Sequence, residues 1–87
     1  MLSKKVTTEI SLHCYAAVGG LMATMSNPKC RGENFTWEKF PDIASNYCEV
    51  QVLLSVIVPD KNREKARRLA KETGHSIAVN WVRQMTE

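Results

Sequence analysis

The chain has 87 residues, of which 44% are hydrophobic and 24% are charged, and its formal net charge is +3. This composition excludes an intrinsically disordered chain, and the length indicates a single domain over residues 1–87. A domain of this size buries only about 60% of the surface that its unfolded form exposes, so a partner or a homodimer would add to its stability.

The three cysteines, Cys14, Cys30 and Cys48, are widely spaced. An odd number at this spacing is a poor disulfide framework, which favours a reducing, cytoplasmic location. The apolar segment 14–25 contains Gly19-Gly20 and is too short to span a bilayer. We therefore expect no membrane partner.

The first regular element is expected over residues 6–16, where apolar and polar side chains alternate. Period-two alternation that includes Val6 and Ile10 predicts a half-buried β-strand. A helix is the alternative within residues 6–26, because Ile10, Cys14 and Val18 follow helical spacing. That helix would hold Gly19-Gly20 in its interior, at a cost of about 1 kcal/mol each. We predict the strand, followed by a hairpin partner or a short helix.

Residues 27–48 are expected to form a long irregular connection, because Pro41 prevents a helical turn over 36–40 from continuing. Large apolar residues in a loop usually fix it to the core, and long structured loops often hold binding sites. The candidate partner contacts in this aromatic-rich loop, 34–47, are Phe35, Trp37, Phe40 and Tyr47.

Residues 49–58 form the most apolar run of the chain. The segment from Val50 to Val58 is rich in β-branched residues and is apolar on both faces, which predicts a central strand covered on both sides. Leu54 lies in the middle of this run and is therefore expected in the core. Pro59 ends the strand at a position where a missing N–H donor matters little.

A basic helix is predicted over residues 60–73. Asp60 is a suitable N-cap, and Gly74 is a typical residue just after a helix C-terminus. The apolar positions Ala66, Leu69 and Ala70 recur at helical spacing with Thr73, so this stripe should face the sheet.

Residues 76–83 fit a strand or a helix. As a strand, Ile77, Val79 and Trp81 share one face, and residues 49–83 become a β-α-β-like unit. As a helix, the segment that starts at Arg68 resembles a helix-turn-helix motif with Gly74 in its turn, although His75 stands where that motif usually has an apolar residue. We favour the strand. The fold class is then α+β, a small domain with a mixed sheet.

The net charge of the chain comes entirely from the predicted helix 60–73. This segment has six basic and three acidic residues, whereas the rest of the chain has six of each. Phosphate contacts require positive charge, and no aromatic residue is present in this helix for base stacking. The candidate residues for binding nucleic acid or another anionic partner are Lys61, Lys65, Arg67, Arg68 and Lys71.

No constellation for catalysis or for metal binding is recognisable. Neither a Cys-x-x-Cys nor a His-x-x-x-His spacing is present. Cys30 lies between Lys29 and Arg31, a setting that can activate a thiol, but nothing nearby in the sequence supplies a base. We expect an ordinary free cysteine there, and a protein that is not an enzyme and has no cofactor or metal.

Together these patterns predict a small binding module whose basic helix docks on an anionic surface, either nucleic acid or a nucleoprotein. The alternative is a protein-binding adaptor or inhibitor that uses the loop 34–47, as in accessory proteins of mobile elements or phages.

Overall fold

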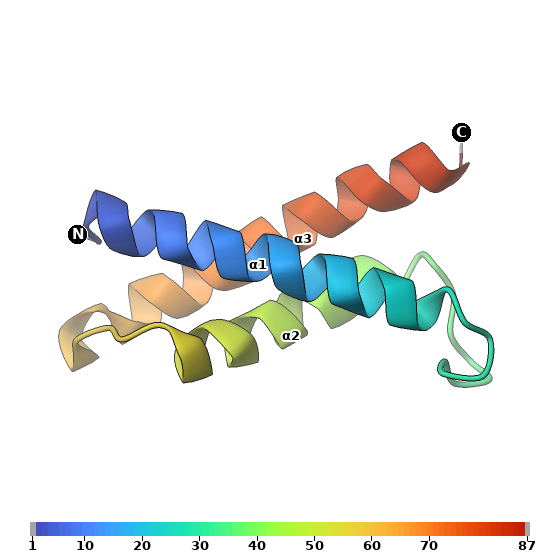
Figure 1. The fold of residues 1–87 in the computed structure, drawn as a ribbon, viewed down its shortest axis with the longest axis horizontal. Coiled ribbons are helices and arrows are strands. Elements are labelled where there is room, and N and C mark those ends of the chain that lie inside the picture. Colours follow the sequence, from blue (N-terminus) through green and yellow to red (C-terminus); the bar gives the residue numbers. More distant parts are fainter. Residues whose placement is uncertain (1, 87) are drawn as a thin grey trace.

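A computed structural model of the chain describes residues 2–86. It contains the helices α1 (Lys4–Met25), α2 (Phe40–Ser55) and α3 (Arg63–Thr86), with a short 3₁₀ helix, η1 (Asp60–Asn62), immediately before α3 (Figure 1). No strand occurs among the described residues. The prediction of an α+β domain with a mixed sheet is therefore wrong, and the fold is a three-helix bundle.

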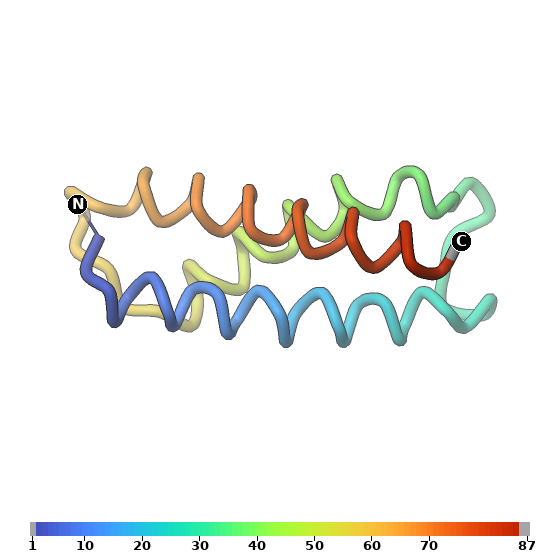
Figure 2. The backbone as a smooth tube through the Cα atoms, turned by 90° about the horizontal axis from the view of Figure 1, so that it is seen from above, coloured from blue at the N-terminus to red at the C-terminus, as the bar shows by residue number. Residues whose placement is uncertain are grey.

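The helices run up, down and up along a bundle that measures 39 × 23 × 16 Å. Figures 1 and 2 show that α1 and α3 begin at the same end, where the loop after α2 also lies. The loop between α1 and α2 closes the opposite end. The contact between α2 and α3 is the most extensive, and α1 lies against both helices.

Small side chains dominate the middle of the core. Helix α1 contributes Ile10, Cys14 and Val18 to a single cluster. The other fully buried side chains come from the facing sides of α2 and α3: Phe40, Ala44, Cys48, Val52, Ala66, Ala70 and Ala78. Because most of these are alanine or cysteine, the helix backbones can approach each other closely.

Helices α2 and α3 pack tightly against each other at Gly74. A Cβ atom added there would lie 2.6 Å from Cys48 Sγ, 2.9 Å from Cys48 Cβ and 3.3 Å from the carbonyl oxygen of Ala44. Nearby, the Ser45 hydroxyl donates a 3.0 Å hydrogen bond to the carbonyl of Lys71. The lack of a side chain at residue 74 therefore allows the crossing that brings the two helices together.

The strand predicted at 6–16 is part of α1. The Ser3 hydroxyl accepts a hydrogen bond from the amide of Val6 at 3.2 Å and so caps this helix. Ile10, Cys14 and Val18, the residues with helical spacing, are buried. The helical alternative was correct, because this buried stripe offsets the cost of the two glycines in the helix interior.

The strand predicted at 49–58 was also wrong, since α2 continues to Ser55 and only the residues after it are extended. The irregular connection predicted over 27–48 is also too long, because residues 40–48 are helical. Pro41 lies in the first turn of α2, where a missing N–H costs nothing, so it starts this helix and does not interrupt it. β-branched residues lower helix propensity only slightly, and packing against α1 and α3 overrides that preference.

The helix predicted at 60–73 is confirmed over residues 63–73, since residues 60–62 form η1, but it does not end at Gly74. Helix α3 continues without interruption to Thr86, so residues 76–83 are not a strand and no turn separates two helices. The resemblance to a helix-turn-helix motif is therefore not confirmed. The sequence signal was misread because a glycine suits a helix C-terminus and a close helix crossing equally well.

Candidate functional site

Three cations of the predicted basic segment are exposed on the side of α3 that faces away from the core. Lys61 lies in η1, and Lys65 and Arg68 lie in the first half of α3. Ala66 and Ala70, on the opposite side of the helix, are fully buried. Among the ion pairs found in the described residues, none involves these three side chains. We call Lys61, Lys65 and Arg68 the outer basic residues.

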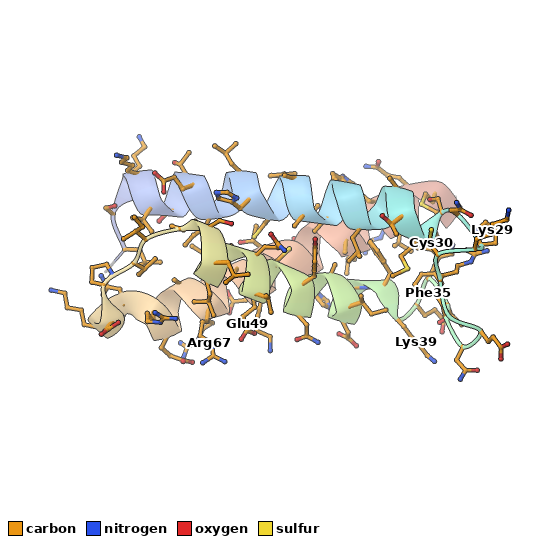
Figure 3. All side chains as sticks on the ribbon, turned by 60° about the horizontal axis from the view of Figure 1, so that its bottom comes forward. Lys29, Cys30, Phe35, Lys39, Glu49 and Arg67 are labelled. Atoms are coloured by element: carbon orange, nitrogen blue, oxygen red, sulfur yellow. The ribbon has the colours of Figure 1, made fainter. Side chains whose placement is uncertain are left out.

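Arg67 and Lys71 are instead directed towards α2, where both contact Glu49. Arg67 Nη2 lies 2.9 Å from Glu49 Oε1, and its Nε donates to the same oxygen at 3.1 Å (Figure 3). Lys71 Nζ is 3.6 Å from Glu49 Oε2. The Glu49 side chain is only 16% exposed. The structure thus divides the five predicted residues into three that are unpaired and two that hold α2 against α3.

Other cations gather at the end of the bundle where α1 and α3 begin. Lys4 and Lys5 occupy the first turn of α1, which contains no acidic residue. Arg63 begins α3 and has only a long, exposed contact of 4.0 Å with Asp60. Cations near a helix N-terminus oppose the helix dipole, so the positive ends of two helices and these side chains reinforce one another.

Acidic residues reduce the positive charge of this surface only in part. Glu64 lies 3.8 Å from Arg67 Nη1, so its charge is directed towards the Glu49 contact. Glu72 lines a groove between α1 and α3 together with Tyr15 and Trp81, whose ring centroids are 6.3 Å apart. That groove contains one charged side chain and offers no arrangement of a base and a nucleophile.

The predicted aromatic contacts lie mainly in the packing at the other end of the bundle. Phe35 meets Trp37 edge to face at 5.1 Å, and Trp37 meets Phe40 at 5.3 Å. Phe40 is fully buried, while Phe35 and Trp37 are half-buried against the core. Arg31 lies over the Phe35 ring at 5.8 Å. The fourth residue, Tyr47, is separate from this cluster and lies on α2 with 41% of its surface exposed.

The cysteines divide into one exposed residue and a buried pair. Cys30 is exposed in the loop after α1, beside Lys29 (Figure 3). Cys14 and Cys48 meet at the helix crossing, where their thiols donate to the carbonyls of Ala70 and Cys14 at 3.6 and 3.8 Å. A hydrogen bond to Cys48, together with burial, raises the pKa of Cys14. The same hydrogen bond lowers the pKa of Cys48. The Cys14 thiol therefore stays protonated, and both side chains fill space at the crossing. The described residues contain no cluster of three or more side chains suited to a metal ion.

Sequence reasoning missed an exposed apolar surface. Leu54, predicted for the core, is 78% exposed, and Val50 and Ile57 are 52% and 94% exposed. The signal that could have revealed it was the apolar character of residues 50–58 on both faces, because a three-helix bundle covers only one face of each helix.

The fold and the candidate surfaces define a three-helix bundle with a basic outer face on α3. No family model, no curated protein sequence and no solved structure matches the chain. Within residues 2–86, no helix has the length and hydropathy needed to cross a membrane.

Proposed function

We propose that the protein is a non-enzymatic binding module whose outer basic residues dock on an anionic surface, either nucleic acid or a nucleoprotein. One observation carries this proposal. Lys61, Lys65 and Arg68 are exposed and have no ion pair within residues 2–86, while their neighbours Arg67 and Lys71 are held by Glu49. The unpaired cations do not have to break an internal ion pair before they bind, so they are the groups available to a partner.

The position of these residues supports the same function. The N-termini of α1 and α3 point to one end of the bundle, and Lys4 and Lys5 lie there as well (Figure 1). Partial positive charges at helix N-termini add to those of the side chains. Such a concentrated positive field accelerates encounter with a polyanion and makes binding strongly dependent on salt.

The chemistry of this surface favours contacts to phosphates over the reading of base sequence. Lys61, Lys65 and Arg68 carry charge, but no aromatic side chain is interleaved with them. Phosphate contacts position a protein on nucleic acid without specifying a sequence, whereas base stacking needs aromatic groups. The proposed binding is therefore independent of sequence.

The alternative function, a protein-binding adaptor or inhibitor that uses the loop 34–47, has weaker support. Phe35, Trp37 and Phe40 are engaged in contacts with one another and with the core. A partner would have to displace this packing in order to use them.

The test compares two variants with the same change in net charge. Lys61→Glu/Lys65→Glu/Arg68→Glu reverses the outer basic residues, and Lys29→Glu/Arg31→Glu/Lys39→Glu reverses three cations at the other end. Fluorescence anisotropy with a short DNA duplex, at several salt concentrations, gives affinity and salt dependence. We expect only the first variant to lose binding, with a log–log salt slope shallower by roughly 0.9 for each lost phosphate contact. Equal losses in both variants would show that net charge alone matters, and unchanged binding in the first would refute the proposal.

A further inference from the structure

The outward-facing side of α2 carries a row of apolar side chains, in which Asn46 is the exposed polar residue. Besides Tyr47, Val50 and Leu54, which are exposed, it includes Ile43 and Leu53, which are half-buried but do not belong to the core cluster or pack against it. We call these five residues the outer face of α2. Ile57, just after the helix, extends the exposed apolar surface.

This face also lacks charge. Helix α2 has only two charged residues, Asp42 and Glu49, and no lysine, arginine or histidine. Glu49 is largely buried against Arg67 of α3, whereas Asp42 is 86% exposed in the first turn of α2 and lies 3.8 Å from His75 Nε2 of α3. A helix at the surface of a globular protein normally has charged residues opposite its buried stripe, and a helix that is apolar all round is normally covered on every side. In the single chain, α2 is covered on one side only.

The spacing of the exposed residues fits another helix. Ile43, Tyr47, Val50 and Leu54 follow one another at steps of four, three and four residues, as do the apolar positions of a coiled-coil seam. This order of steps is the same when it is read in either direction. A second α2 that runs antiparallel therefore presents the same spacing, with Ile43 opposite Leu54 and Tyr47 opposite Val50.

We propose that this face is a homodimer interface, in which the α2 helices of two copies pack antiparallel about a two-fold axis. An isologous interface requires a surface that is complementary to itself, and the spacing meets that requirement. Charge restricts where two copies can meet. Two chains of +3 repel each other, and the outer face of α2 is a surface through which they can meet without opposing like charges.

The same face does not fit a lipid surface or nucleic acid. Helices that lie in a membrane interface carry lysine and arginine beside their apolar side, and phosphate contacts need cations. Helix α2 has neither lysine nor arginine. Dimerisation through α2 would leave the outer basic residues of α3 free, since they lie on the side of α3 that faces away from the core. The dimer would then present two copies of the proposed docking surface.

Sedimentation velocity over a range of protein concentrations tests the dimer. We expect the parent chain to sediment as a dimer at micromolar concentration, and Val50→Glu/Leu54→Glu to weaken association by at least roughly 100-fold, because the carboxylates would be buried without partners against Tyr47 and Ile43 of the second copy. Leu12→Glu is a single-charge control, to be compared also with Leu54→Glu alone, since Leu12 is 64% exposed on α1 and lies outside the interface. It should dimerise like the parent.

Cysteine cross-linking provides an independent check that does not depend on the stability of the glutamate variants. In a Cys30→Ser background, Val50→Cys should form a disulfide-linked dimer under mild oxidation, and Leu12→Cys should remain a monomer. A parent chain that stays monomeric at all concentrations would overturn the proposal, even if another protein or a lipid vesicle bound the outer face of α2. A dimer unaffected by Val50→Glu/Leu54→Glu, or linked through residue 12, would also overturn it.

Discussion

Helices α2 and α3 meet through the same small-residue crossing, yet their outward-facing sides differ in chemistry. Lys65 and Arg68 are exposed on the outer side of α3, and Lys61 lies just before this helix. The outer side of α2 instead exposes the apolar side chains of Val50 and Leu54. Packing within a single chain accounts for the charged outer side of α3, but it does not account for apolar side chains on the outer side of α2. Charge suits the surface of α3 to an anionic partner, and apolar character suits the surface of α2 to a second copy.

The largest effect is expected where the two helices meet. Gly74→Ala should lower the free energy of unfolding by about 1–3 kcal/mol, because its Cβ would clash with Cys48 and with the Ala44 backbone. Gly20→Ala is the matched control in α1, where nothing lies within 4 Å of an added Cβ. It should stabilise the helix by about 0.5–1 kcal/mol. Urea unfolding of both variants measures the difference, and equal effects would contradict the close crossing.

A smaller effect is expected at the ion pairs that join the two helices. Glu49→Gln should cost about 1 kcal/mol, because it removes the charged acceptor shared by Arg67 and Lys71. Asp60→Asn should change stability little, since its 4.0 Å contact with Arg63 is exposed. Urea unfolding at low and high salt should show that only the Glu49 variant loses stability. A change of the same size in both variants would mean that Glu49 does not hold α2 against α3.

The smallest effect on folding is expected at Leu54, which the sequence placed in a central strand. Because its side chain is 78% exposed, Leu54→Asp should change the unfolding free energy of the monomer by no more than about 0.5 kcal/mol. Circular dichroism of dilute protein during thermal unfolding checks this. Unfolding of the variant under conditions in which the parent is monomeric and folded would place Leu54 in the core of the single chain.

Part of the fold could be predicted from sequence. The stripe of Ala66, Leu69 and Ala70 indicated a helix and its inward side, and Ala66 and Ala70 are indeed buried. The strands at 6–16 and 49–58 were wrong because alternation and β-branched residues express preferences of only about 1 kcal/mol, which tertiary packing overrides. The helix end predicted at Gly74 was wrong because the residues that require a glycine there, Cys48 and Ala44, lie far away in the chain.

The candidate site was only partly readable for the same reason. The sequence located the excess of positive charge in residues 60–73, but it could not show that Arg67 and Lys71 reach Glu49, which precedes them by 18 and 22 residues. Helical spacing separates Lys61, Lys65 and Arg68 from the buried stripe. Whether Arg67 and Lys71 are free or paired depends on where α2 places Glu49.

Sedimentation velocity with and without a short DNA duplex tests whether the outer faces of α2 and α3 have separate roles. We expect Val50→Glu/Leu54→Glu to abolish the dimer while each monomer still binds the duplex. We expect Lys61→Glu/Lys65→Glu/Arg68→Glu to abolish binding to the duplex and to leave the dimer intact. A folded variant that lost both properties, or neither, would show that the two faces do not have separate roles.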